Sequence, residues 1–200
     1  MKYIIATLLI LLVAANAFGQ TKITVLSYQM SVPDQNLEEY INETSFRGVG
    51  FDGRWFAGGS SFTGGISLAW HVFNKSTDGT IEFPNGALTG KQNRYINSFP
   101  IMLTGHLYFG NKNRLWMFIG GGVGTYYIIQ RFEAGVHSIE ESAWHLGAYP
   151  EFGLQIPLSE ADFFINGKYN YAFEAGESVT GDKLDLAYWT VSVGLAYQGW

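Results

Sequence analysis

Beyond residue 20 the chain alternates apolar and polar side chains with a period of two, and this alternation recurs in eight separate segments. Successive side chains of a β-strand point to opposite faces, so the period predicts strands, and no segment carries the sustained stripe of a helix. The eight predicted strands occupy approximately residues 22–32, 45–57, 62–74, 95–109, 115–131, 142–157, 162–174 and 184–198. The pattern therefore predicts an all-β protein.

One face of each predicted strand is bulky and apolar, and the other is small or polar. In the third strand, for example, Ile66, Leu68 and Trp70 alternate with Ser67 and Ala69. A soluble β-sandwich would show the same alternation, but its strands usually have only about 5–6 residues. Strands of about 11 residues are what a tilted crossing of a bilayer requires. Strand length therefore favours a transmembrane barrel with the apolar face outward.

The connections between these strands alternate in length. The longer ones span 33–44, 75–94, 132–141 and 175–183, and the short turns are Ala57–Ser61, Gly110–Arg114 and 158–161. Strict alternation places all longer loops at one end, which is typical of up-and-down outer-membrane barrels with extracellular loops and periplasmic turns. An even number of strands brings both termini to the periplasmic side. Since unpaired backbone groups are costly in hydrocarbon, the antiparallel sheet must close, and side chains fill the lumen of an eight-stranded barrel.

Residues 1–19 have the features of a cleaved signal peptide. Lys2 supplies a positive start, Ile4–Val13 is almost entirely apolar, and small residues lead up to Gly19. The apolar run is shorter than the ~20 residues that a membrane-spanning helix needs. Cleavage after Ala17 and after Gly19 both fit, and we expect the latter. The mature domain is then residues 20–200.

Composition narrows the possible functions. The chain has 25 glycines, only 14% charged residues, a net charge of −5 and no cysteine. The low charge and high glycine content fit a membrane barrel better than a soluble domain. The negative balance argues against a nucleic-acid partner, and the lack of cysteine excludes disulfides and a thiol nucleophile. The loops are acidic, which accounts for solubility at a cell surface.

Several segments carry a resemblance to a known group of proteins. They are SFRGVGFDGRWF (45–56), ISLAWHVFNK (66–75), RYINSFPIMLTGHLYFG (94–110) and the final YWTVSVGLAYQGW. In these segments the chain resembles the small OmpA- and OmpW-like outer-membrane barrels common in Bacteroidetes. The resemblance implies a place among outer-membrane lipid and lipopolysaccharide, and a C-terminal signal, Tyr197 and Trp200, for the barrel-insertion machinery. These aromatics are three residues apart instead of two, so either Trp200 faces the other side or a bulge lies at Gly199.

Four charged residues lie at strand positions that are predicted to face the lumen: Asp52, Arg54, Glu151 and Lys168. Their formal charges cancel. If the 158–161 turn is centred between residues 159 and 160, Glu151 faces Lys168 across the hairpin. Buried charges need partners, so we interpret the four as an interior ion network. The alternative is a gate whose ion pairs exchange to open a narrow path.

Other candidate chemistry is weaker. His71, His106 and His145 also point inward, but their unequal heights favour ordinary hydrogen-bonded histidines over a metal site. No outward His is followed two residues later by Ser, which argues against a lipid-modifying enzyme of the barrel type. Residues 120–124 (GGGVG) lie mid-strand with no helix after them, so no phosphate-binding loop or other cofactor site is predicted.

Pro100 and Pro150 lie within predicted strands. Proline cannot donate a ladder hydrogen bond, so we expect a β-bulge at each of them.

The sequence thus predicts an outer-membrane barrel with a structural or surface-interaction role, a filled lumen and no catalysis. A conduit for small hydrophobic molecules, similar to OmpW, is the first alternative, and a lipid A-modifying enzyme is the second. The ligand, the oligomeric state and any surface partner stay open.

Overall fold

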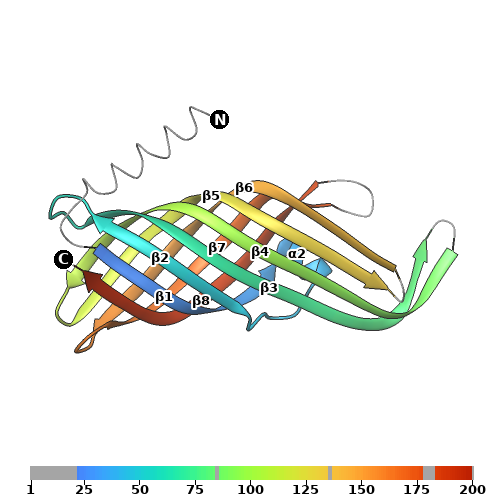
Figure 1. Ribbon diagram of the computed structural model, residues 1–200, viewed down its shortest axis with the longest axis horizontal. Coiled ribbons are helices and arrows are strands. Elements are labelled where there is room, and N and C mark those ends of the chain that lie inside the picture. Colours follow the sequence, from blue (N-terminus) through green and yellow to red (C-terminus); the bar gives the residue numbers. More distant parts are fainter. Residues whose placement is uncertain (1–21, 84–85, 135–136, 178–182, 200) are drawn as a thin grey trace.

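The computed structural model describes residues 22–83, 86–134, 137–177 and 183–199. The predicted signal peptide (1–19) and Trp200 lie outside these residues. Eight antiparallel strands and one short helix make up the described chain: β1 (Lys22–Asp34), α2 (Gln35–Tyr40), β2 (Gly48–Phe56), β3 (Phe62–Phe83), β4 (Gly86–Asn111), β5 (Leu115–Ala134), β6 (His137–Pro157), β7 (Asp162–Glu177) and β8 (Lys183–Gly199). Each strand pairs with the next, and β1 pairs with β8, so the sheet is a closed up-and-down barrel as predicted (Figure 1).

The three short turns, the first residue of β1 and the last residue of β8 lie at one end of the barrel, which we call the turn end (Figure 1). The longer connections lie at the other end, the loop end. Among the described residues, no helix is long and apolar enough to cross a membrane.

The apolar faces of the strands point outward. Leu26, Leu103 and Phe152 are 63%, 54% and 64% exposed, although each would be a core residue in a soluble protein. The opposite faces are buried inside the barrel, including polar residues such as Gln155 and Ser192. The inward and outward parity predicted from the sequence is therefore confirmed.

The strands at the loop end are longer than predicted. The segment 75–94, expected as a loop, is almost entirely a hairpin of β3 and β4, paired from Lys75↔Arg94 to Phe83↔Gly86. The expected loop 132–141 is likewise a continuation of β5 and β6, paired up to Ala134↔His137. The strands β3 to β6 therefore project beyond the rest of the barrel wall (Figure 1).

The first connection also differs from the prediction. It contains α2, and β2 begins at Gly48, so 45–47 is not strand apart from an isolated bridge between Ser31 and Ser45. The side chain of Asp34 accepts a hydrogen bond from the Gln35 N–H and caps the helix. The helix was missed because six residues are too few for a periodic pattern.

The predicted bulges at the prolines are wrong. The register of β3 with β4 is the same on both sides of Pro100, and the register of β6 with β7 is the same on both sides of Pro150. Each proline lacks the N–H that would bond to the strand on one side, so it interrupts that ladder without shifting its register. On the other side both prolines stay paired with β5. The register shift that the structure does contain lies between Ala172 and Gly176, in the pairing of β7 with β8.

Aromatic rings packed on glycines fill the lumen. The ring of Tyr149 covers Gly122, and a Cβ atom at Gly122 would lie 2.8 Å from Cζ of that ring. The ring of Phe118 covers Gly153 in the same manner. Alternating large and small side chains on neighbouring strands thus fill a lumen of this diameter.

Candidate functional site

The barrel interior is arranged in layers. A lower apolar cluster lies toward the turn end and contains Ile23, Val25, Phe56, Tyr108, Phe118, Phe164 and Ala196. An upper cluster lies toward the loop end and contains Leu37, Ile41, Phe73, Ile96, Met102, Tyr126, Ile128, Tyr149, Ala172, Ala175, Leu186 and Tyr188. The four charged residues singled out from the sequence are all buried. These four charged side chains therefore lie between two apolar clusters.

Arg54 and Glu151 form the shortest ion pair among these four residues. Nη2 of Arg54 donates to Oε1 of Glu151 at 2.7 Å, and Nη1 donates to the Tyr108 hydroxyl at 2.9 Å. The guanidinium carbon also lies 4.4 Å from the ring centre of Phe118 and 5.3 Å from that of Phe164. Since β2 carries Arg54 and β6 carries Glu151, this ion pair joins opposite parts of the barrel wall.

Lys168 has looser contacts. The register places it opposite Glu151, as the hairpin geometry predicts. Its Nζ nevertheless lies 4.0 Å from Oε2 of Glu151 and closer, 3.5 Å, to Oδ1 of Asp52. Strand register thus brings Glu151 and Lys168 face to face, and the side chain of Lys168 also reaches toward Asp52.

Two members of the network were not assigned to it from the sequence. Nε2 of His106 lies 3.0 Å from Oε2 of Glu151, and the Asn166 side-chain amide donates to Oε1 at 2.6 Å. Their inward parity was visible, but their convergence on Glu151 was not. Glu151 thus receives contacts from three strands besides its own.

His71 lies in a different hydrogen-bonded group. Nδ1 of His71 lies 2.9 Å from the Ser31 hydroxyl, which in turn lies 3.0 Å from the Thr190 hydroxyl. His145 is half-buried on β6. Among the described residues, no three His, Cys, Asp or Glu side chains are grouped so as to hold a metal ion.

The helix α2 covers the mouth of the barrel. Leu37 and Ile41 are buried in the upper cluster. Nη1 of Arg94 donates to the Tyr40 carbonyl at 3.0 Å, and the guanidinium carbon lies 4.8 Å from the centre of the Tyr40 ring. Burial raises the pKa of the Tyr40 hydroxyl, and the positive charge of Arg94 opposes that shift. The first connection is therefore an inward plug rather than a free loop.

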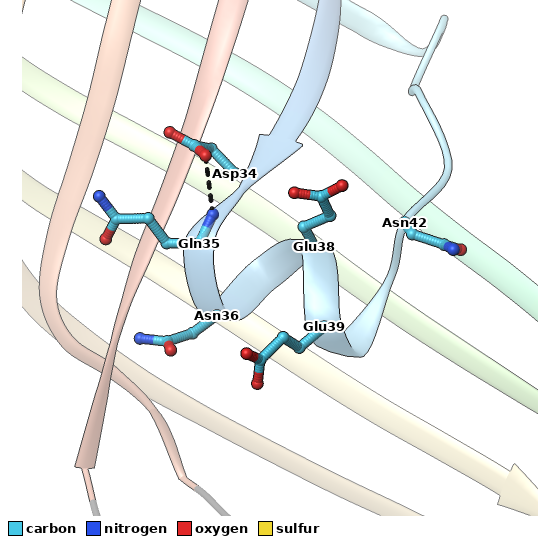
Figure 2. Close-up of a pocket in the computed structure, with 6 residues that line it drawn as sticks. All are labelled: Asp34, Gln35, Asn36, Glu38, Glu39 and Asn42. Carbon is cyan, nitrogen blue, oxygen red and sulfur yellow. Dashed lines mark hydrogen bonds between the residues drawn. The ribbon is translucent and has the colours of Figure 1, made fainter.

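An open hollow of about 590 Å³ surrounds the outer side of α2. It is lined by Asp34, Gln35, Asn36, Glu38, Glu39 and Asn42. These side chains point away from one another and do not converge on a common point (Figure 2). The geometry is that of a solvated acidic surface, in agreement with the interpretation of the acidic loops.

On the outer surface, aromatic rings from four adjacent strands form a row near the loop end. Ring centres of Trp70 and Phe99 are 5.9 Å apart, those of Phe99 and Tyr127 are 6.3 Å apart, and those of Tyr127 and Trp144 are 4.9 Å apart. We call these four residues the upper aromatic row. Near the turn end, Tyr197 of the predicted insertion signal is 49% exposed on the outer face. Its companion Trp200 lies outside the described residues.

Comparison with solved structures shows that the chain has the fold of small eight-stranded outer-membrane barrels. The neisserial surface protein A superposes with a TM-score of 0.53 at 8% identity, over 90% of this chain and 97% of that one. The outer membrane protein OprG from Pseudomonas aeruginosa superposes with a TM-score of 0.50 at 15% identity, over 90% of this chain and 96% of that one. No protein family and no curated protein matches the sequence.

Proposed function

We propose that this protein is an integral barrel of a bacterial outer membrane, with a closed lumen and a structural or surface-interaction role rather than a catalytic one. The observation that carries the proposal is the inverted distribution of side chains: bulky apolar residues cover the outer wall while charged residues are buried within. In water this exposed surface would far exceed the apolar patches of soluble monomers.

The height of the apolar wall supports insertion in a bilayer. On β4 the outward aromatics Phe99 and Phe109 are ten residues apart. At ~3.4 Å per residue the segment is ~34 Å long, and a strand tilt of ~40° reduces its height to ~26 Å. This agrees with the apolar band of ~25 Å that is bounded by aromatic girdles in outer-membrane barrels.

The packed interior supports a closed lumen. Two apolar clusters lie on either side of the ion network, and the upper one includes Leu37 of α2 and Ile41, the residue that follows the helix. A conduit for hydrophobic molecules would need a continuous apolar passage, whereas here charged side chains cross the barrel between the clusters.

We further propose that the loop end faces the cell exterior and that both termini are periplasmic. The short turns and the strand ends β1 and β8 share one end, as in the topology of outer-membrane barrels. In this orientation lipopolysaccharide surrounds the upper part of the wall. Tyr197, together with Trp200, would serve the insertion machinery during assembly.

Two measurements test the proposal. After expression in a Gram-negative host, the protein should be recovered with the outer membrane and should be protected there from urea extraction. Purified protein in planar bilayers should then give no reproducible conductance, and liposomes containing it should not swell in solutions of small sugars. Recovery in the soluble fraction would refute the membrane assignment, and steady single-channel currents would refute the closed lumen in favour of the conduit.

A further inference from the structure

In the part of the barrel wall nearest the loop end, strand β7 is no longer paired with strand β6 among the described residues. Strands β6 and β7 pair from Pro157↔Asp162 up to Gly147↔Ala172, and the described residues form no β6–β7 pair beyond that point. Strand β6 nevertheless continues toward the loop end, paired with β5 as far as Ala134↔His137. Among the residues that the structure describes, its β7-facing side is therefore an unpaired strand edge.

A specific local structure in β7 produces the separation. Glu174 has a positive φ of 50°, and the register of β7 with β8 shifts between Ala172 and Gly176. The carboxylate of Asp185 accepts hydrogen bonds from the Glu174 N–H at 2.9 Å and from the Tyr171 hydroxyl. The Gln130 side chain donates to the Ala175 carbonyl at 2.8 Å, and Ala175 is buried at the mouth. The upper part of β7 is thus held inward, away from β6.

The orientation of the β6 backbone follows from two observations. The N–H of Leu158 donates to Ala161 across the turn that joins β6 to β7. Pro150 interrupts the ladder with β7 but not the ladder with β5. Even-numbered residues of β6 therefore direct their N–H and C=O groups toward the β7 side. Above the separation these groups belong to Ser138, Glu140, Ser142 and Trp144.

The segment Ser138–Trp144, which we call the β6 edge, is accessible along its whole length: all seven residues are exposed. It has no proline, no lysine and no bulge, so the one common protective device of edge strands that it carries is the negative charge of Glu140 and Glu141. Ile139 and Trp144 are 63% and 60% exposed and offer apolar contacts beside the backbone groups.

The charge of the edge selects its partner. Arg131 on β5 forms ion pairs with Glu140, at 2.6 Å, and with Glu133, at 3.6 Å. Glu141 forms no ion pair with the described residues. One arginine thus stands against three glutamates, and these four side chains of β5 and β6 have a net charge of −2. An added strand with Lys or Arg at alternate positions would be favoured, and an acidic strand would be repelled.

We propose that the β6 edge is a docking site for an extended basic segment of a partner polypeptide, which adds to the sheet as a further strand. Backbone hydrogen bonds from even-numbered residues would supply affinity, and the glutamates would supply selectivity. The inference goes beyond the proposed function, and binding to the purified protein does not depend on the cellular location.

The test uses a fluorescent peptide of seven residues that alternates Lys and Val, with capped ends. Binding to the full chain in a zwitterionic detergent is measured by fluorescence anisotropy, with empty micelles as the blank. Two further peptides serve as probes of mechanism: one has Glu in place of Lys, and the other has N-methyl groups on alternate amides along the hydrogen-bonding edge. We expect binding of the first peptide and at least tenfold weaker binding of the other two.

Matched variants locate the site. Ser142→Pro removes an edge-facing N–H but no β5 hydrogen bond, so binding should weaken at least about fivefold, the effect of losing one backbone hydrogen bond. Ser142→Ala should bind as the original chain does. Strand β3 pairs with β2 only up to Gly48↔His71, and the Val72 N–H donates to the Arg47 carbonyl, so even-numbered residues of β3 direct their backbone N–H groups toward the β2 side. Ser76→Pro therefore places the same change on an unpaired edge of β3 and should leave binding unchanged.

If Ser142→Pro does not fold, Glu141→Lys replaces it and should also weaken binding. The proposal is overturned if the alternating Lys peptide does not bind, if the N-methylated peptide binds as tightly, or if Ser76→Pro weakens binding as much as the β6 variant does.

Discussion

Replacing Arg54 with methionine should destabilise the barrel more than replacing Lys168 with methionine, although both side chains are buried cations of the same network. Methionine keeps much of the volume of either side chain and removes the charge. In Arg54→Met, Glu151 loses its 2.7 Å partner, and the Tyr108 hydroxyl loses a donor. Lys168→Met removes longer contacts: ion pairs of 3.5 Å to Asp52 and 4.0 Å to Glu151, a hydrogen bond of 3.4 Å to the Ser67 hydroxyl, and a contact of 4.9 Å with the centre of the Tyr149 ring.

The magnitudes follow from this geometry. Removing one partner of a buried ion pair costs about 3–5 kcal/mol, because the other charge stays buried without compensation. His106 and Asn166 remain in contact with Glu151, which places Arg54→Met near the lower end of that range. Losing a hydrogen bond to a charged group costs about 1.5–3 kcal/mol, and the long ion pairs of Lys168 place its variant near the lower end of that range. We expect the two variants to differ by at least about 1 kcal/mol.

The assay is equilibrium unfolding in urea, with the protein folded into phospholipid vesicles and tryptophan fluorescence as the readout. Folded protein is quantified independently by its altered mobility in unheated gel samples. Lys168→Met is the matched comparison, and Arg54→Met combined with Glu151→Gln measures the coupling between the two residues. In the double variant the neutral amide no longer needs a cation, so its free energy of unfolding should lie above that expected from adding the single effects.

Two results would refute this reasoning. If Lys168→Met lowers the free energy of unfolding more than Arg54→Met does, then strand register rather than side-chain contact determines the pairing. If the effects of Arg54→Met and Glu151→Gln are simply additive, the ion pair makes no separate contribution to stability.

Three other predictions concern packing, orientation and the β7 bend. Gly122→Val should lower the free energy of unfolding by about 1–3 kcal/mol, because its Cβ atom would lie 2.8 Å from the Tyr149 ring. Gly64→Val is the control and should be tolerated, because a Cβ atom at Gly64 faces open space. Equal effects of the two variants in urea unfolding would contradict the filled lumen. The chain has no cysteine, so Ser76→Cys should react with an impermeant maleimide on intact cells and Ser60→Cys only after the outer membrane is permeabilised; the reverse pattern would invert the proposed orientation. Hydrogen bonds from Tyr171 and from the Glu174 N–H hold the pKa of Asp185 below its ordinary value, so this carboxylate favours the folded bend at neutral pH, and the contribution disappears as pH falls through the lowered pKa. The protection of the Glu174 amide, measured as the exchange rate of an unstructured chain divided by the observed rate at the same pH, should therefore fall selectively in acid, and Asp185→Asn should remove that pH dependence.

Local patterns in the sequence were enough to predict the barrel. The period of two identified eight strands, and parity alone separated outward Leu68 from inward Ser67. The Glu151↔Lys168 register could be derived because a tight turn of known centre determines pairing along its own hairpin. Each of these inferences involves residues on one strand or on two strands that are adjacent in the chain.

Contacts across the lumen could not be derived in this way. The distance between Arg54 on β2 and Glu151 on β6 depends on the stagger accumulated around the closed sheet and on side-chain length, and no single hairpin contains that information. The turn signals in 75–94 also misled the prediction, since Asp78-Gly79 lies within paired strand. The helix α2 gives no periodic signal either, since Leu37 is the one buried residue among its six.

The rim of the barrel is uneven, because β3 to β6 continue outward while the upper part of β7 bends inward toward the mouth. A cylinder with a level rim presents the same profile to every neighbour as it rotates about the membrane normal. An uneven rim gives the molecule a direction within the plane of the membrane, and an approaching partner must then meet the correct azimuth as well as the correct height. Such an orientational requirement lowers association rates, and a charged edge that attracts its partner from a distance counteracts that effect.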